Sequence, residues 1–484
     1  MKMSSDRYLE RGLCKLSLDI QICIQTFIEP LDVMSLRKTC KYLCDVTYQR
    51  SVWLHVARRV CVSRGLFLPS FPLEIMSRRA LEHVALSSSS YRFCRMLIEM
   101  DADKPLIPGS IHILDSRCAS FTNPPRQSRE LYLIPGGRYL ITRSDTAINL
   151  WDLGIDIAGR MRPLPVAALQ SSAVEVYNPR PTDDGLGILL FVATVNDAGM
   201  TCGISVYSIY PSTPNPVFLL LTSLGGFNVT MGVWSSNDTR LAFLHSGRRI
   251  LTIWDFKHNS ILSWDNHNAE VFDILIFEDH VILFESRRFS LYKVPPLRPR
   301  KSEGGLGDVL AQGHSLMDFA YPSTDYCARL AVHWNPWTPL LNNYLFFGVV
   351  VDDAIGGGGS INYYIMKPLD DPDLPKMIPL LLACLATDYR LRLSTSSTLH
   401  LCGQYLSQSW FDPMYGVQIK LSTIPTKTVA SGGTGGDFDR TIKLWAPGHN
   451  GDVVRDCSIC PATGRLCLMT HDQEIRVIDF LTPL

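Results

Sequence analysis

The sequence of 484 residues predicts a multidomain α+β protein in which a small helical unit precedes a large all-β unit. Apolar residues repeat with helical period from Leu16 to about Met100. From Leu106 onward they form short β-type runs separated by Gly, Pro, Asn and Asp. Hydrophobic residues make up 46% of the chain and charged residues 19%, a composition that suits packed cores and not a mostly disordered chain.

Three short helices are expected in the first unit. Pro30 should end the first helix after Glu29, Asp32 is a candidate N-cap for the second, and Ser51 for the third. Helices of about 10–14 residues are marginal in isolation, so these three should pack on each other and on a further surface. Their apolar stripes are Ile20, Cys23, Ile24, Phe27 and Ile28, then Val33, Leu36, Cys40 and Leu43, then Trp53, Ala57, Val60 and Cys61.

A second helical stretch, Leu73–Met100, follows a proline-containing break at Pro69–Pro72 and is interrupted at Ser87–Ser90. It is typical of a connector between the helical unit and the β unit. We therefore predict boundaries at residues 12–64 for the helical domain, 65–104 for the connector and 105–484 for the β domain.

The β domain contains an internal repeat. Residues 137–152 align without a gap on residues 464–479, residues 240–255 align with one insertion, and residues 439–445 match the end of the same unit. Each copy indicates strand, polar turn, strand. A four-stranded sheet cannot cover both its faces alone, whereas a ring of such blades can, so we expect a β-propeller. Seven candidate strand ends predict seven blades: Trp151, Tyr207, Trp254, Tyr292, Tyr364, Trp445 and Ile478.

The blade count depends on one long interval. From Tyr364 to Trp445 the chain runs 81 residues, which leaves room for another blade.

Charge is unevenly distributed along the chain. Lys and Arg balance Asp and Glu at 46 each, which disfavours a protein that binds nucleic acid through phosphate contacts. Residues 1–100 carry 15 Lys and Arg against nine Asp and Glu, a net charge of +6, so the remainder carries −6. The basic side chains either form a solvated helix face or attract an acidic protein partner. They are Arg58, Arg59, Arg64, Arg78, Arg79, Arg92 and Arg95.

Cellular context can also be inferred. No apolar run approaches the ~18 residues of a membrane helix, and residues 1–7 lack the apolar core of a secretory signal. Fourteen scattered cysteines suit reduced, buried thiols better than a disulfide framework. We expect a cytoplasmic or nuclear protein that contacts no membrane.

Motifs for catalysis or cofactor binding are missing from the sequence. Gly432–Gly436 and Gly356–Gly359 do not continue into a phosphate-binding loop. Cys457 and Cys460 have zinc-like spacing, with Cys467 and His471 downstream, but they fall in predicted strands whose residues alternate between faces. We therefore expect no catalytic residue, no metal and no cofactor, although a triad assembled from distant residues stays open.

Part of the repeat resembles the WD-repeat family of β-propellers. The pattern Asp-x-x-Ile-x-Leu-Trp occurs at residues 145–151 and 439–445, and residues 250–255 match it more loosely. The Gly-His pair that opens a typical repeat is degenerate; Gly448-His449 and Gly313-His314 are the clearest candidates. The resemblance implies structural roles inside the blades for Asp145, Trp151, Trp254, Asp439, Trp445 and Asp472.

Residues 16–61 resemble the F-box, a three-helix module that docks onto the Skp adaptor of cullin-type ubiquitin ligases. Order, spacing and residue class agree across Leu16–Asp32, Leu36–Leu43, Trp53 and Arg58–Cys61, and Ser17 stands where a proline is usual. Implied adaptor-facing residues are Leu16, Leu18, Ile20, Ile24, Phe27, Leu31, Leu36, Cys40, Leu43 and Trp53.

For several of these residues, membership of the helical core is an equal alternative. Core packing is at least as plausible as adaptor contact for Ile24, Cys40 and Leu43. The family's adaptor is acidic, so the basic first unit would favour the encounter.

The two resemblances together imply a function. The chain would be the substrate-recognition subunit of an SCF-type E3 ubiquitin ligase, binding the Skp adaptor, and through it a cullin, while the propeller binds a protein substrate for ubiquitination. Two alternatives are a propeller scaffold outside any ligase and a propeller with a hydrolytic or ligand site in its channel. The sequence does not identify the substrate.

Overall fold

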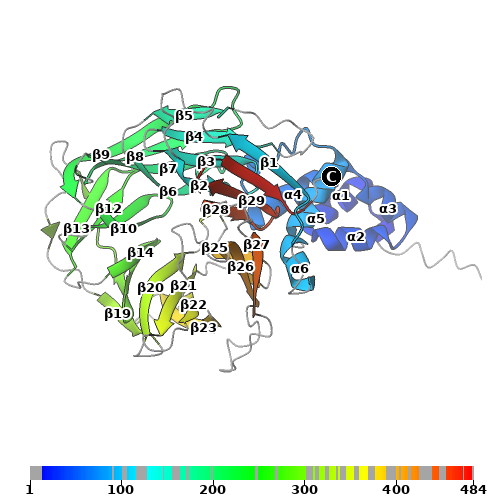
Figure 1. Cartoon of the computed structure of the whole chain (residues 1–484). Coiled ribbons are helices and arrows are strands. Elements are labelled where there is room, and N and C mark those ends of the chain that lie inside the picture. The colour runs from blue at the N-terminus through cyan, green and yellow to red at the C-terminus, as the bar shows by residue number, and fades with distance from the viewer. Residues whose placement is uncertain are drawn as a thin grey trace, which may run out of the picture.

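The computed structural model describes the helical part of the chain and the strands of the β part (Figure 1). The described residues are 13–89, 92–100, 106–115, 128–144, 147–154, 164–170, 174–196, 198, 200–229, 231–245, 249–266, 271–300, 309–310, 315–321, 326–333, 336–337, 345–353, 359–368, 377–387, 399–402, 405–412, 416–423, 439–445, 454–472 and 474–481.

Seven antiparallel sheets form a seven-bladed β-propeller (Figure 1). Blade 1 comprises β2 Ser128–Leu133, β3 Tyr139–Ser144, β4 Ala147–Asp152 and β5 Ala167–Gln170. Blade 2 comprises β6 Val174–Pro181, β7 Ile188–Val195, β8 Thr201–Ile209 and β9 Leu219–Val229. Blade 3 comprises β10 Met231–Ser236, β11 Arg240–His245, β12 Ile250–Asp255 and β13 Ser260–Asp265, joined by the short β17 Arg298–Pro299 and β18 Val309–Leu310.

The remaining blades follow in chain order. Blade 4 comprises β14 Val271–Phe277, β15 His280–Glu285, β16 Arg288–Lys293 and β19 Ser315–Ala320. Blade 5 comprises β20 Tyr326–His333, β21 Leu345–Asp353, β22 Gly359–Pro368 and β23 Met377–Thr387, and blade 6 comprises β24 Leu399–Cys402, β25 Tyr405–Asp412, β26 Gly416–Thr423 and β27 Asp439–Trp445. Blade 7 comprises β28 Val454–Cys460, β29 Arg465–Thr470, β30 Glu474–Asp479 and β1 Ser110–Asp115.

The ring is closed by strands from opposite ends of the β domain. Strand β1 pairs antiparallel with β30, with Ser110 opposite Asp479 and Asp115 opposite Glu474. The outer strand of blade 7 therefore comes from the segment that precedes blade 1 in the sequence. Apolar clusters then join neighbouring blades, so that the two large faces of a blade are covered and only short edges are left.

The repeat predicted from the sequence is confirmed, with one displaced marker. Six of the seven predicted strand ends lie on the third strand of their blade in chain order. These strands are β4, β8, β12, β16, β22 and β30. The seventh, Trp445, ends β27, which is the fourth strand of blade 6. The long interval from Tyr364 therefore holds β23 and blade 6 and no further sheet among the described residues. The similar Asp-x-x-Ile-x-Leu-Trp strings occupy different strands because both alternate apolar and polar residues, which suits either position.

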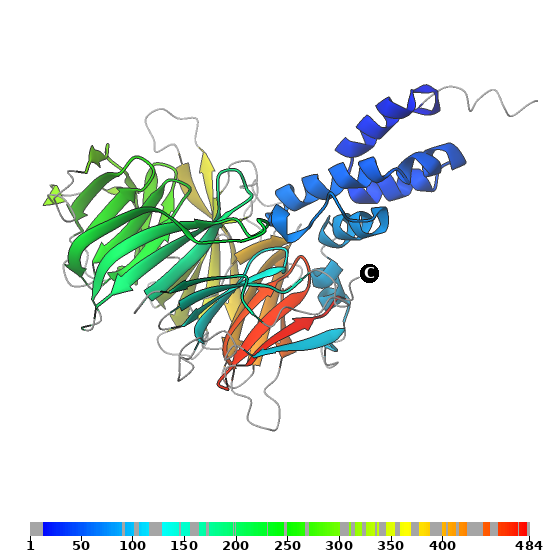
Figure 2. The same ribbon diagram turned by 90° about the horizontal axis from the view of Figure 1, so that it is seen from above.

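Six α-helices are described before the propeller, and they project from one side of it (Figures 1 and 2). They are α1 Leu18–Phe27, α2 Pro30–Arg37, α3 Lys41–Thr47, α4 Arg50–Ser63, α5 Arg78–Ser89 and α6 Arg92–Glu99, with the 3-10 turns η2 Leu13–Lys15 and η3 Leu68–Ser70. We call residues 13–100 the helical head.

The helical prediction needs several corrections. Both predicted N-caps are wrong, because Glu29 precedes α2 and Gln49 precedes α4, so that Asp32 and Ser51 lie inside these helices. Pro30 is the first residue of α2 rather than only a stop for α1, because the first turn of a helix needs no backbone N–H from that position. The second predicted helix is two helices, since Cys40 is extended at φ −156° and ψ 162° and caps α3 by accepting a bond from Leu43 N. Residues 18–63 therefore form four helices instead of three.

The head and the propeller share one apolar core. Cluster residues from α4 and α5 pack with Leu131, Leu140 and Trp151 of blade 1 and with Met469 of blade 7. A Cβ at Gly136 would lie 2.5 Å from Ser70 Cβ, so the β2–β3 turn needs glycine where the head meets it.

Polar and aromatic contacts fix the same junction. Phe67 N donates to Pro135 O at 3.1 Å. The rings of Phe93 and Phe480 stack at 5.5 Å. The head is therefore held rigidly on blades 1 and 7.

Candidate protein-docking surface

The first helix of the head turns its apolar stripe outward. Ile20 and Phe27 are exposed at 49% and 75%, and Cys23 between them is exposed. Gln21 and Gln25 occupy the inward side of α1, each 1% exposed. A helix that buries glutamines and exposes a stripe of apolar residues lacks the partner that would cover that stripe.

More exposed apolar residues lie at both ends of this helix. Leu13 in η2 and Leu18 at the start of α1 are exposed, and Leu31 at the start of α2 is exposed at 55%. In Figure 2, α1 is the darkest blue helix and lies at the outer edge of the head. We call Leu13, Leu18, Ile20, Cys23, Phe27 and Leu31 the docking face.

The ten adaptor-facing residues implied by the sequence divide into three groups. The exposed ones are Leu18, Ile20, Phe27 and Leu31; the half-buried ones are Leu16, Ile24, Leu36 and Cys40; the buried ones are Leu43 and Trp53. Trp53 is 0% exposed and donates its indole Nε1–H to Thr47 O at 2.8 Å. Leu43 therefore has the core role that the sequence left open for it, and Trp53, expected to face the adaptor, is also a core residue.

Two polar side chains, Gln21 and Arg59, hold α1 in place; the sequence had suggested for Arg59 only a solvated helix face or an acidic partner. Gln21 Nε2 donates to Leu13 O at 2.9 Å and Leu16 O at 3.0 Å, which ties η2 to the helix. Arg59 on α4 donates to Thr26 O at 2.7 Å and also to Ile28 O, which satisfies carbonyls at the other end of α1. Gln21 interrupts an apolar pattern, a feature that could have marked it, whereas Arg59 directly follows Arg58 and carries no such signal.

Most arginines of the basic head are engaged within it. Arg58 pairs with Glu74, Arg78 with Glu82 and Arg95 with Glu99, while Arg59 binds backbone carbonyls. These arginines are therefore committed to contacts within the head, and the docking face itself is apolar rather than basic.

The residues with predicted blade roles have varied surroundings. Trp151 is 1% exposed and donates Nε1–H to Thr142 Oγ1 at 3.0 Å, and Trp254 is fully buried. Asp472 is exposed in the β29–β30 turn, and Asp439 begins β27. Asp145 lies outside the described residues, as do Gly432–Gly436, Gly448-His449 and Gly313-His314.

A repeated ion pair had not been predicted as a feature of the blades. Arg465 binds Asp479 through two bonds of 2.6 and 3.0 Å. Arg138 binds Asp152 in the same way at 2.9 and 2.8 Å, and the corresponding Arg240 lies 4.0 Å from Asp255. The sequence alignment places these residues at its second and last positions, so the pairs could have been found there.

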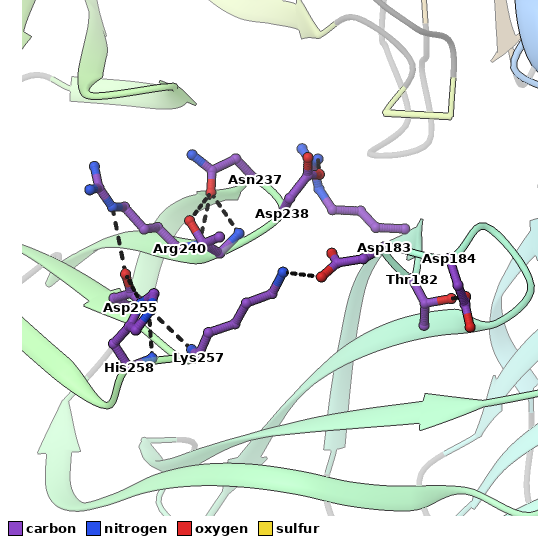
Figure 3. Close-up of polar contacts among 11 residues, drawn as sticks. Thr182, Asp183, Asp184, Asn237, Asp238, Arg240, Asp255, Lys257 and His258 are labelled. Atoms are coloured by element: carbon purple, nitrogen blue, oxygen red, sulfur yellow. Dashed lines mark hydrogen bonds and ion pairs between the residues drawn. The ribbon is translucent and has the colours of Figure 1, made fainter.

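The turns of blades 2 and 3 carry a network of charges (Figure 3). Lys257 Nζ lies 2.5 Å from Asp183, His258 Nδ1 lies 3.0 Å from Asp255, and the Asn237 side chain bonds to Thr239 N and Arg240 N. Arg180 on β6 is half-buried and donates to Ser236 Oγ at 2.9 Å, and its loss of solvation lowers its pKa to about 10.

This network shares a rim with the head. Each of these turns joins the first strand of a blade to the second or the third strand to the fourth, so all of them lie at the same end of the antiparallel strands. The β2–β3 turn, which contacts the head, also joins a first strand to a second and therefore lies on that rim. An apolar cavity of about 300 Å³ separates head and network, lined by Phe71 and Ile75 on one side and Leu186 and Ser212 on the other.

The cysteines with zinc-like spacing do not converge. Cys457 packs in the core between blades 6 and 7, while Cys460 and Cys467 pack in the core shared with the head. Burial raises the pKa of the Cys467 thiol to about 12 and that of Cys457 further, which favours protonated thiols. The described residues contain no group of three or more His, Cys, Asp or Glu arranged to hold a metal ion.

Within the described residues, no helix has both the length and the apolar character needed to cross a membrane.

Comparison with known proteins gives structural similarity at low sequence identity. The chain matches no protein-family model and no curated protein sequence. The β-propeller domain of Myceliophteria thermophila Cps50 (Swd1) is similar at 11% identity and a TM-score of 0.44, covering 73% of this chain and 96% of that domain. The computationally designed Ika8 protein is similar at 11% identity and a TM-score of 0.38, with the same coverage. The assignment of the fold therefore depends on the seven sheets of this chain and not on these similarities.

Proposed function

We propose that this protein is a non-catalytic substrate receptor of a cullin-type ubiquitin ligase. In this proposal the docking face binds a Skp-type adaptor and the propeller binds a protein substrate. The observation that supports it most is the outward apolar stripe of α1, with Ile20 and Phe27 exposed while Gln21 and Gln25 are buried. A stripe of this kind fits a groove on another protein.

The rigid junction between head and propeller supports the same proposal. A receptor promotes transfer by holding a substrate lysine close to the conjugating enzyme, which makes the reaction effectively intramolecular. That advantage depends on a fixed geometry between the adaptor-binding surface and the substrate-binding surface. The shared core and the Phe67–Pro135 bond supply such a geometry.

The competing function is a propeller scaffold for protein–protein interaction outside any ligase. The sequence feature that supports this function is Ser17, which stands where an F-box usually has a proline. In the structure Ser17 is exposed with φ −59° and ψ 153°, a φ close to the value that proline imposes. The backbone thus has the shape that a proline would give, which favours the adaptor-binding function over the scaffold.

Calorimetric titration of the full chain with a Skp-type adaptor tests the proposal. We expect binding by the native chain and a loss of roughly 30-fold in affinity for Phe27→Ala, because a central buried anchor contributes about 2 kcal/mol. Leu31→Ala should weaken binding in the same direction. Ile75→Ala is the matched control, since Ile75 is 85% exposed but lies outside the docking face.

Circular dichroism should show an unchanged fold for all three variants. Failure of the native chain to bind would overturn the proposal in favour of the scaffold. Equal affinities for the native chain and Phe27→Ala would show that the docking face is not the adaptor site.

A further inference from the structure

A cavity of about 490 Å³ in the helical head carries an excess of positive charge. Its charged lining consists of Arg37, Arg78, Arg79 and Arg92 against Glu82 alone. It lies among residues of α2, α5 and α6, and none of its lining residues belongs to the docking face. Its volume is in the range of sites that hold small molecules or peptide side chains.

The single carboxylate is fully engaged by two of the arginines. Glu82 accepts bonds from Arg37 at 2.7 and 3.2 Å and from Arg78 at 2.7 Å. Arg79 and Arg92 are exposed, and no ion pair of either is found within the described residues. Two guanidinium groups therefore keep their donors for another anion.

The walls of the cavity are ordered before any ligand binds. The guanidinium groups of Arg37 and Arg78 lie 4.4 and 4.7 Å from the centre of the Tyr48 ring, and Arg37 Nε donates to Thr47 Oγ1 at 3.0 Å. Burial, and to a lesser extent the nearby Arg92, lowers the pKa of His83, in keeping with the excess of positive charge in this cavity.

We propose that this cavity binds the phosphate group of a phosphorylated serine or threonine in an extended peptide. Arginine forks match phosphate oxygens with paired hydrogen bonds, which Arg79 and Arg92, having no ion pair among the described residues, can make. The cavity is much larger than one phosphate, so it also holds residues beside the phosphorylated one. Leu86 and Tyr48 give that peptide apolar contacts, and the Ser87 hydroxyl lies in the same lining.

Fluorescence anisotropy with the full chain tests this proposal. The probe is a labelled heptapeptide mixture with a central phosphoserine and degenerate flanks. We expect saturable binding to the native chain, at least tenfold weaker binding to the double variant Arg79→Gln/Arg92→Gln, and no saturable binding of the unphosphorylated mixture. Inorganic phosphate should compete only at concentrations at least tenfold above that of the peptide.

The matched control is Arg58→Gln/Arg95→Gln. It removes two exposed head arginines that pair with Glu74 and Glu99 outside the cavity, and it should bind within twofold of the native chain. Unchanged thermal unfolding of both double variants separates lost binding from lost folding. Absence of binding to the phosphorylated mixture, equal binding of the unphosphorylated mixture or of inorganic phosphate, or unchanged binding by Arg79→Gln/Arg92→Gln would each overturn the proposal.

Discussion

Helix α1 and the blade strands use apolar residues in opposite ways. In β3 and β29 every described side chain is buried, because neighbouring blades or the head cover both faces. In α1 the residues with the smallest exposure are two glutamines, and the apolar stripe is exposed. The difference teaches that an apolar pattern predicts burial only where the chain itself supplies the opposite surface; elsewhere it predicts a partner.

The largest expected effect is the difference in unfolding free energy between a variant of the head's core and a variant of the docking face. Trp53→Ala should lower the free energy of unfolding by about 3–5 kcal/mol, because it empties a fully buried site and removes the indole N–H that donates to Thr47 O. Phe27→Ala should change it by less than about 0.5 kcal/mol. Urea unfolding of both variants measures the contrast, and a similar loss for the two would contradict the assignment of Phe27 to an exposed face.

A second contrast lies within the propeller. Arg465→Met should cost about 3 kcal/mol of unfolding free energy, since it removes the partner of Asp479, which is 4% exposed, and the donor to Gly137 O and Gly154 O. Arg138→Met should cost clearly less, because Asp152 has water access at 18% side-chain exposure. Chemical denaturation monitored by tryptophan fluorescence compares them, and equal costs would show that burial does not decide the value of these pairs.

The two buried glutamines sharpen the comparison further. Gln25→Met should keep or raise stability by about 1 kcal/mol, because no hydrogen-bond partner of its Oε1 is found among the described residues. Gln21→Met should lower stability by about 1–2 kcal/mol, since it breaks the bonds to Leu13 O and Leu16 O. Thermal unfolding checks the two signs; a loss in both variants would mean that Gln25 has a structural role as well.

The smallest effect concerns the turn before α1. Ser17→Pro should raise the unfolding free energy by about 0.5 kcal/mol, because φ is already near the proline value and the unfolded chain loses freedom. Ser77→Pro is a useful control, because the Ser77 hydroxyl accepts a bond from Ala80 N that proline would remove. Calorimetric melting temperatures distinguish the outcomes, and destabilisation by Ser17→Pro would show that this turn needs its backbone N–H.

Sequence periodicity alone determined the order of the protein: helices first, connector next, then a seven-bladed propeller. The helical and strand periods differ enough to be recognised locally, and the repeat at residues 137–152 and 464–479 requires no knowledge of distant contacts. Of the docking face, periodicity singled out Ile20, Cys23 and Phe27; the F-box resemblance added Leu18 and Leu31, and nothing in the sequence singled out Leu13.

Tertiary structure decided which side of each pattern faces inward. The stripe of α1 has the spacing of a core helix, yet packing against α4 buries Gln21 and Gln25 instead, because only α1's opposite side meets another helix. Likewise Trp445 lies on a fourth strand and β1 completes blade 7, since strand order depends on pairings between residues far apart in the chain. The basic cavity of the head exists only because α2, α5 and α6 bring Arg37, Arg79 and Arg92 together, a proximity that no local spacing encodes.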